Sequence, residues 1–221
     1  MRAPEPFDNL AETHSFALGI DLGGTKTEAI ALRAHGTLLD RWRVPSPVGD
    51  YAATVRLIAD LAAFAASRFG SDFSVGIGMP GAISPATGLV KNANSTWLIG
   101  HPFGRDLGEA LGRPVALAND ADCFALSEAS DGGAAGAASV WGIILGTGVG
   151  SGIVVGGRLL GGPNAIAGEW GHNPLPWPTD AERDGPPCYC GHKGCVETFL
   201  SGPGFTADHA RRTGETLTPA A

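Results

Sequence analysis

The chain has 221 residues, 43% of them hydrophobic and 34 of them glycine, and its formal net charge is −7. This composition is typical of a globular α/β protein, and the acidic balance leaves no basic surface for nucleic acid. No apolar run is long enough for a signal peptide or a membrane span. We therefore expect a cytoplasmic protein that binds a small molecule and has no membrane partner.

The first third of the chain predicts a β-meander followed by a helix. Apolar or alternating runs separated by glycine turns predict three strands, at 16–21, 27–33 and 38–44. Asp50 is placed to cap a helix that ends at Gly70. The apolar stripe expected on this helix consists of Leu57, Leu61 and Phe64.

The arrangement of strand, glycine turn and strand occurs twice in the sequence. Strands are expected again from Ser74 and from Pro114, and a helix from Ala121. The segment SVWGIILGTGVGSGIVVGG then repeats at Gly146 the pattern already present at Gly23. This weak repeat predicts two related lobes, at residues 16–136 and 137–221. A flexible extension, residues 1–15, would precede them.

Two glycine-rich turns, DLGGTK at 21–26 and LGTGVG at 145–150, are candidates for phosphate binding. A dinucleotide-binding motif must open a helix, but GIVVGG after the second turn is strand-like, and DLGGTK lacks the spacing of a P-loop. Two β-hairpins remain, whose glycines would allow positive φ and a close approach of backbone N–H groups to an anion. An ordinary tight turn is the alternative for each.

Three of the four cysteines lie within CYCGHKGC, at 188–195. The spacing C-x-C-x4-C contains no redox C-x-x-C pair, and a reducing compartment favours metal binding over a disulfide. Three cysteines with one of two histidines, His172 or His192, are compatible with a zinc site. Free thiols in a surface loop are the alternative.

Six motifs follow one another in the order found in the ROK family: DLGGTK, GMPG, NDAD, LGTGVG, GEWGH and CYCGHKGCVETFLSG. From about Phe16 to Phe205 the chain resembles this family of bacterial sugar kinases and related repressors. The resemblance implies an α/β, actin/hexokinase-like (ribonuclease H-like) two-lobe kinase fold with a zinc-stabilised loop. Family members are longer, so we expect an incomplete second lobe in a C-terminally truncated chain. A repressor would carry a helix-turn-helix domain before the first strand, where only about fifteen residues precede Phe16.

The resemblance also implies a role for individual residues in phosphoryl transfer from ATP, with magnesium, to the 6-hydroxyl of a hexose. Asp120 corresponds to the catalytic base. The residues expected to bind the nucleotide are Asp21, Gly23, Gly24, Thr25, Lys26, Gly146, Thr147 and Gly148. The residues expected to bind the sugar are Gly81, Asn94, Asn119, Asp120, Glu169, His172 and Glu197. A structural zinc would be held by His172, Cys188, Cys190 and Cys195, while His192 corresponds to a variable position.

The sequences of three segments resemble those of the bacterial fructokinases (manno/fructokinases) more than those of the N-acetylglucosamine kinases. These segments are KNANSTWL, GEWGHNPLPW and PCYCG. D-fructose is therefore the expected substrate and fructose 6-phosphate the expected product. The alternatives are N-acetylglucosamine or another hexose, or an inactive zinc-stabilised fragment that binds sugar. The resemblance implies a homodimer for the full-length form.

Overall fold

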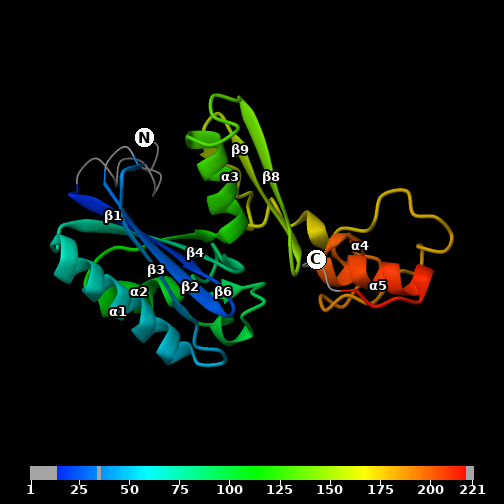
Figure 1. The fold of residues 1–221 in the computed structure, drawn as a ribbon, viewed down its shortest axis with the longest axis horizontal. Coiled ribbons are helices and arrows are strands. Elements are labelled where there is room, and N and C mark those ends of the chain that lie inside the picture. Colours follow the sequence, from blue (N-terminus) through cyan, green and yellow to red (C-terminus); the bar gives the residue numbers. More distant parts are fainter. Residues whose placement is uncertain (1–13, 34–35, 218–221) are drawn as a thin grey trace. The chain divides into compact units, whose positions relative to one another are not determined.

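Two sheets, one in each of two units, form the framework of the chain (Figure 1). The computed structural model describes residues 14–33 and 36–217, and the units comprise Met1–Asp120 and Ala121–Ala221. Most of the predicted flexible extension, residues 1–13, lies outside the described residues. His14 and Ser15 are described, and both form hydrogen bonds to the carboxylate of Asp72.

The sheet of the first unit has the strand order β3-β2-β1-β4-β7. Its strands are β1 (Phe16–Leu22), β2 (Lys26–Leu32), β3 (Leu38–Pro45), β4 (Phe73–Met79) and β7 (Ala116–Asn119). The first three strands pair antiparallel and form the predicted meander. Strands β1, β4 and β7 pair parallel, so their carboxyl ends lie at one edge of the sheet.

Helix α1, Tyr51–Phe69, begins and ends where the sequence predicts it. The carboxylate of Asp50 accepts a hydrogen bond from the backbone N–H of Ala53 at 2.8 Å, and Gly70 ends the helix with a φ of +98°. The predicted apolar stripe was wrong for Phe64, whose side chain is 44% exposed. The buried face follows smaller residues that allow closer packing: Thr54, Ile58, Leu61, Ala62 and Ala65.

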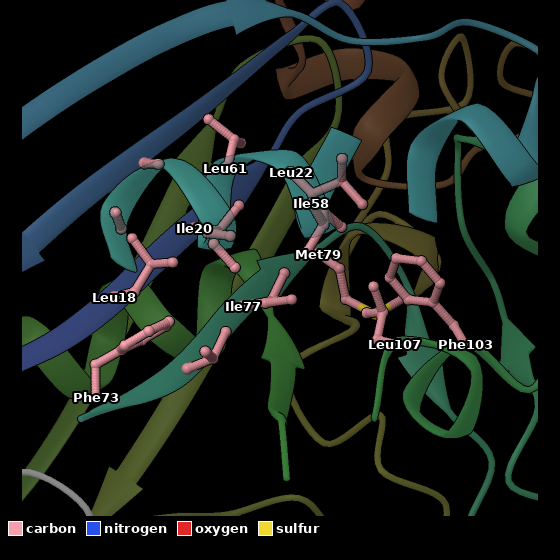
Figure 2. Close-up of a cluster of buried hydrophobic side chains, with 14 of the residues drawn as sticks. Leu18, Ile20, Leu22, Ile58, Leu61, Phe73, Ile77, Met79, Phe103 and Leu107 are labelled. Carbon is pink, nitrogen blue, oxygen red and sulfur yellow. The ribbon is translucent and has the colours of Figure 1, made fainter. Parts of the chain in front are cut away.

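One hydrophobic core stabilises the first unit (Figure 2). Helices α1 and α2 (Phe103–Leu111) are in contact and pack their apolar side chains against strands β1 and β4. The large side chains at the centre are each at most 6% exposed: Leu18, Ile20, Leu22, Ile58, Leu61, Ile77, Met79, Phe103 and Leu107. Burial of one such side chain contributes about 1.5–3 kcal/mol. A short hairpin of β5 (Ala82–Ile83) and β6 (Val90–Lys91), followed by the 3₁₀ helix η2 (Thr96–Leu98), precedes α2.

The sheet of the second unit has the order β10-β9-β8 and repeats the first hairpin. Strands β8 (Ser139–Leu145) and β9 (Val149–Val155) pair antiparallel, and β10 (Arg158–Leu159) pairs with β9. Both hairpins join two seven-residue strands by a short turn, at 23–25 and at 146–148. The structure therefore contains the predicted internal repeat.

Helix α3, Asp120–Ser130, packs closely on this second sheet. A Cβ atom at Gly152 would lie 2.5 Å from the carbonyl oxygen of Ala121, and one at Gly142 would lie 2.9 Å from the Cβ of Ala125. Only glycine allows this approach. The sequence-based boundary after residue 136 grouped α3 with the first lobe, whereas in the structure its residues from Ala121 onward belong to the second unit.

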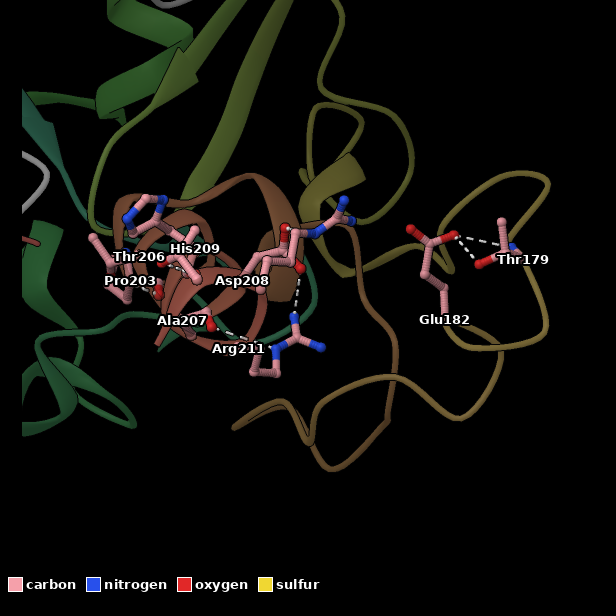
Figure 3. Close-up of polar contacts among 10 residues, drawn as sticks. Thr179, Glu182, Pro203, Thr206, Ala207, Asp208, His209 and Arg211 are labelled. Atoms are coloured by element: carbon pink, nitrogen blue, oxygen red, sulfur yellow. Dashed lines mark hydrogen bonds and ion pairs between the residues drawn. The ribbon is translucent and has the colours of Figure 1, made fainter. Parts of the chain in front are cut away.

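The remainder of the second unit consists of loops and short helices: η3 (Trp170–His172), α4 (Glu197–Leu200) and α5 (Gly202–Thr213). Local polar contacts fix these segments (Figure 3). The carboxylate of Glu182 accepts hydrogen bonds from the N–H and the hydroxyl of Thr179, and Arg211 pairs with Asp208 along α5. Within the described residues, no helix is long and apolar enough to cross a membrane.

Candidate functional site

In the first unit, predicted site residues gather at the carboxyl ends of the parallel strands. Asp21 of β1 is in register with Gly78 of β4, and Met79 of β4 with Asn119 of β7. The side-chain amide of Asn119 donates a hydrogen bond to the carbonyl oxygen of Gly81 at 3.0 Å. Ligands of open α/β sheets bind at this edge, so the topology supports a binding site here.

Two carboxylates, those of Asp21 and Asp120, lie close enough for their charges to interact at this edge. The pKa of Asp21 is raised, first by loss of hydration and then by repulsion from Asp120 and Glu28. The chemistry of the pair suits a divalent cation, because hard cations prefer carboxylate oxygens and would relieve the repulsion. Asp120 is exposed at the start of α3, where it can also accept a proton from a bound hydroxyl.

Gly81 must be glycine for two reasons. Its φ is +78°, and a Cβ atom there would lie 2.5 Å from the carbonyl oxygen of Lys91. The backbone of Gly81 is therefore fixed beside Asn119. Asn94, the other predicted amide contact, is exposed between β6 and η2. Its neighbour Ser95 is buried, with its hydroxyl 3.9 Å from where a Cβ of Gly24 would be.

The first glycine hairpin is held by Ser46, a residue that the sequence analysis did not identify. The Ser46 hydroxyl donates to the carbonyl of Gly23 at 2.7 Å, and its N–H donates to the carbonyl of Thr25 at 3.0 Å. Thr25 and Lys26 are exposed at the turn, where an ammonium group could meet a phosphate.

The explanation predicted for the hairpin glycines was wrong in one respect. None of Gly23, Gly24, Gly146 and Gly148 has a positive φ. At two of them the reason for glycine is space: a Cβ at Gly23 would lie 2.6 Å from the carbonyl of Lys26, and one at Gly148 would lie 2.6 Å from the carboxylate of Glu197. The glycines therefore permit close approach rather than an unusual backbone conformation.

The second hairpin is held by residues far along the chain. Glu197 accepts a hydrogen bond from the N–H of Val149 at 2.8 Å, and the N–H of Gly202 donates to the carbonyl of Gly146 at 2.8 Å. Thr147 remains exposed at the turn between these two contacts. Glu197 was predicted as a sugar contact, and its bond to the hairpin was not foreseen.

The GEWGH segment, residues 168–172, packs directly on the backbone of β9. The hydroxyl of Ser151 donates to the carbonyl of Gly168 at 2.8 Å, and the indole of Trp170 donates to the carbonyl of Gly150 at 3.3 Å. Side chains at Gly168 or Gly171 would overlap the β9 carbonyls of Ser151 and Val149. The half-buried Glu169 and His172 therefore extend from a segment that is fixed to the strand.

The structure brings His172 together with Cys188, Cys190 and Cys195. Their ligand atoms all lie within 4.8 Å of one another, with 3.6 Å between the sulfurs of Cys190 and Cys195 and 3.5 Å between Nδ1 of His172 and the sulfur of Cys188. A tetrahedral zinc with Zn–S bonds of about 2.3 Å and a Zn–N bond of about 2.0–2.1 Å would place these atoms about 3.5–3.8 Å apart. The four residues fit such an ion.

Burial and hydrogen bonding shift the pKa values of two thiols of the cluster in opposite directions. Burial raises the pKa of Cys195 to about 12, whereas hydrogen bonds from His192 lower the pKa of Cys190 to about 6. A buried thiol of this kind becomes a thiolate ligand when a dication compensates its charge. His192 touches Cys190 through Nδ1 at 3.5 Å but is not among the four residues that converge.

Tyr189 is a further residue that the sequence analysis missed. Its hydroxyl lies 2.9 Å from Nε2 of His172, and the two rings meet edge to face. The second ring nitrogen of His172, which was expected to meet the sugar, therefore has a protein partner. Nothing in the sequence around Tyr189, which lies between Cys188 and Cys190, indicates a contact with His172.

Comparison with known proteins places the chain among sugar kinases by similarity. It is 41% identical over 191 residues to an N-acetyl-D-glucosamine kinase of Yersinia pestis, covering 85% of this chain and 75% of that protein. It is 43% identical over 203 residues to an N-acetyl-D-glucosamine kinase of Vibrio cholerae, covering 89% and 67%. A ROK family glucokinase from Streptomyces griseus, solved with glucose and AMPPNP, superposes with a TM-score of 0.72 at 30% identity, covering 90% and 62%.

These similarities do not support the predicted fructokinase subtype and agree better with the alternative, N-acetylglucosamine. Both curated relatives are N-acetyl-D-glucosamine kinases, so the preference for a fructokinase is not supported. Two of the three segments behind that preference, GEWGHNPLPW and PCYCG, contain His172, two of the cysteines of the cluster and the glycines that pack on β9. Residues that bind a metal or allow close packing shape the scaffold of the site and carry little information about the substituents of the sugar.

The expected ROK actin/hexokinase-like fold class is confirmed, since a ROK hexokinase from Thermus thermophilus and the ROK family glucokinase both superpose on the chain, with TM-scores of 0.74 and 0.72. The chain spans about two thirds of the length of its relatives, between 62% and 75% in the three cases above. The ROK family model matches residues 17–221, and the chain belongs to this family.

Proposed function

We propose that the protein transfers the γ-phosphoryl group of ATP to the 6-hydroxyl of N-acetyl-D-glucosamine. The observation that carries the chemistry is the group of Asp21, Asn119 and Asp120 at the carboxyl ends of parallel strands. The names of the curated relatives support the choice of sugar. Other hexoses are the alternatives that an assay must separate.

In this proposal the oxygen of the sugar 6-hydroxyl attacks the γ-phosphorus, and Asp120 accepts the proton of that hydroxyl. The bond between the γ-phosphorus and the bridging oxygen breaks, and ADP leaves. Asn119, held by its bond to Gly81, orients the sugar. Magnesium, when bound with ATP, would neutralise phosphate charge, and the carboxylate of Asp21 is a suitable partner for it. Phosphoryl transfer needs this positioning and charge compensation more than covalent chemistry.

The glycine hairpins would bind phosphate oxygens through the exposed Thr25, Lys26 and Thr147 and through backbone N–H groups. Glu169 and Glu197 would accept hydrogen bonds from sugar hydroxyls, and the amide of Asn94 would accept or donate them. His172, with Nδ1 at the cluster and Nε2 beside the hydroxyl of Tyr189, would support these residues rather than contact the sugar. We assign zinc a structural role, because four protein ligands leave no open coordination position.

A coupled assay of ADP release tests the proposal on this chain. N-acetyl-D-glucosamine, N-acetyl-D-mannosamine, glucose and fructose are compared at equal concentration, and kcat/KM should be highest for N-acetyl-D-glucosamine. A preference for fructose would contradict the sugar. Binding of N-acetyl-D-glucosamine by calorimetry without any ADP release would contradict the kinase activity and favour a sugar-binding module.

Substitution of the proposed base provides the second arm of the assay. Asp120→Asn keeps the shape of the side chain and loses its basicity, so kcat should fall by about 10²–10⁴ while sugar affinity changes little. Asp122→Asn, two residues further on α3, is the matched control and should retain the rate. Equal losses in the two variants would argue against Asp120 as the base.

A further inference from the structure

We infer that Glu197 is a positioning residue that couples the second glycine hairpin to the cysteine and histidine cluster, so that metal binding controls the order of the hairpin. This role is separate from the sugar contact proposed above. If the hairpin binds phosphate, as the proposed function has it, its order would also affect nucleotide binding; only this consequence rests on the proposed function. The coupling itself follows from contacts within the second unit.

The hairpin contact has three parts. Oε2 of Glu197 accepts the N–H of Val149 at 2.8 Å, directly after the turn. Gly148 provides the space for this carboxylate, because a Cβ atom there would lie 2.6 Å from the same oxygen. Five residues after Glu197, the N–H of Gly202 donates to the carbonyl of Gly146 at 2.8 Å. The segment 197–202 therefore holds both ends of the turn.

The same glutamate is tied to the cluster through Cys195, two residues earlier. The carbonyl of Cys195 accepts hydrogen bonds from the N–H of Thr198 at 2.9 Å and from its hydroxyl at 2.7 Å. These bonds form the turn from which the side chain of Glu197 extends. The position of Cys195 therefore sets the position of the carboxylate.

The cluster closes a ring of contacts around the hairpin. On one side, residues 168–171 pack on β9 and lead to His172. On the other side, Cys195 leads to Glu197 and back to Val149. The backbone contributes one more link across the cluster, from the N–H of Val196 to the carbonyl of Asn173 at 2.9 Å. A metal ion bound by both His172 and Cys195 would connect the two sides of this ring of contacts. Removal of the ion would leave the hairpin less restrained.

The two roles of Glu197 use different oxygens. Within the described residues, Oε1 makes no hydrogen bond, whereas Oε2 is engaged by Val149. A sugar hydroxyl can therefore bind Oε1 while the hairpin bond stays in place. A residue that served the sugar alone would not need the space that Gly148 supplies.

Amide hydrogen exchange of Val149, followed by NMR in the zinc-loaded protein, tests the inference without any substrate. In Glu197→Ala the exchange rate of Val149 should rise about tenfold or more, because a charge-assisted hydrogen bond is lost. Glu197→Gln should retain most of the protection, since its amide oxygen still accepts the bond. Glu182→Gln, which alters another carboxylate that binds a backbone N–H, is the matched control and should leave Val149 unchanged.

The coupling to metal requires a second comparison. Chelation should raise the exchange rate of Val149 in the unsubstituted chain but add little in Glu197→Ala, because the link is already broken there. Equal increases in both proteins, a Val149 that stays protected in Glu197→Ala, or a protein that binds no zinc would each overturn the inference. If Glu197→Ala fails to fold, Gly148→Ala displaces the same carboxylate from the other side, and amides of β1 report whether the first unit remains intact.

Discussion

The two units contain the same hairpin and stabilise it in different ways. In the first, alternate side chains of β1 are buried under helices, and Leu18 is fully buried. In the second, the corresponding strand β8 leaves Trp141, Ile143 and Leu145 between 40% and 58% exposed. A repeated strand pattern therefore does not imply a repeated core.

The second unit replaces large apolar contacts by close backbone packing and polar bonds. Glycines bring α3 and the GEWGH segment onto the sheet, and Glu197 and the cysteine cluster hold the hairpin from a distance of about fifty residues along the chain. Less apolar area is available per residue in such an arrangement, so a metal ion has more to contribute. We therefore expect the stability of the first unit to depend on its hydrophobic core, and that of the second unit to depend on metal binding at the cluster of His172, Cys188, Cys190 and Cys195.

The largest effect should follow metal removal. Structural zinc contributes about 10–16 kcal/mol to small zinc domains, so chelation should unfold the loops of residues 168–200 while the first unit stays folded. Hydrogen exchange with and without a chelator measures this difference. Cys195→Ser should act like the chelator, and Cys123→Ser is the control outside the cluster. Loss of protection in both units together would contradict the comparison.

A cavity in the hydrophobic core should destabilise the first unit and leave metal binding in the second unit unchanged. Ile58→Ala removes a fully buried side chain from α1 and should lower the free energy of unfolding of the first unit by about 2–5 kcal/mol. Chemical denaturation followed through amide signals of β1 and β4 measures this loss. Leu38→Ala, at a position 56% exposed, should cost less than about 0.5 kcal/mol. Zinc content should be unchanged in both variants, and a loss of zinc from Ile58→Ala would show that the units are not independent.

The glycine contacts of the second unit should respond to added bulk. A Cβ at Gly152 would lie 2.5 Å from the carbonyl of Ala121, so Gly152→Ala should cost about 1–3 kcal/mol by forcing α3 from the sheet. Gly146→Ala is a matched control, because a Cβ there meets no atom within 4 Å and φ is not positive. Thermal denaturation of the two variants should separate them, and equal stabilities would contradict the packing role of Gly152.

Most of the secondary structure was predictable, because periodicity and caps are local signals. Asp50 and Gly70 mark the ends of α1, and the glycine turns mark both hairpins. The identity of the buried residues was less predictable. Phe64 was expected in the core because it is hydrophobic, but its side chain is exposed. The smaller Thr54 and Ala65 are buried on the face of α1 that packs on the sheet.

At the candidate site, residues with distinctive chemistry could be found from spacing, and their partners could not. Three cysteines in eight positions mark a cluster, and the structure adds the convergence of His172. The bonds of Ser46 to the first hairpin and of Glu197 to the second depend on segments distant in sequence. Ser46 carries no signal in a single sequence, because serine is a common residue. Glu197 was named through the family motif as a sugar contact, and nothing in the sequence indicated its bond to the hairpin.

The smallest expected effect concerns Asp21 and the pH dependence of the first unit. Because the folded chain raises the pKa of Asp21 above its ordinary value of 3.8, the native state binds this proton more tightly than the unfolded chain does. Stability from this group is therefore greatest below pH 3.8 and falls as pH rises through the raised native pKa.

Asp21→Asn removes the repulsion from Asp120 and Glu28, so the variant should be slightly more stable than the unsubstituted chain at pH 7, with no such gain below pH 3.8. Asp60→Asn, on the exposed side of α1, is the control for a lost carboxylate outside this group. Chemical denaturation at both pH values, followed through the amides of β1 and β4, measures the difference. A variant that is less stable at pH 7 would mean that a partner stabilises the carboxylate of Asp21. The pair of Asp21 and Asp120 would then not be a candidate site for a cation.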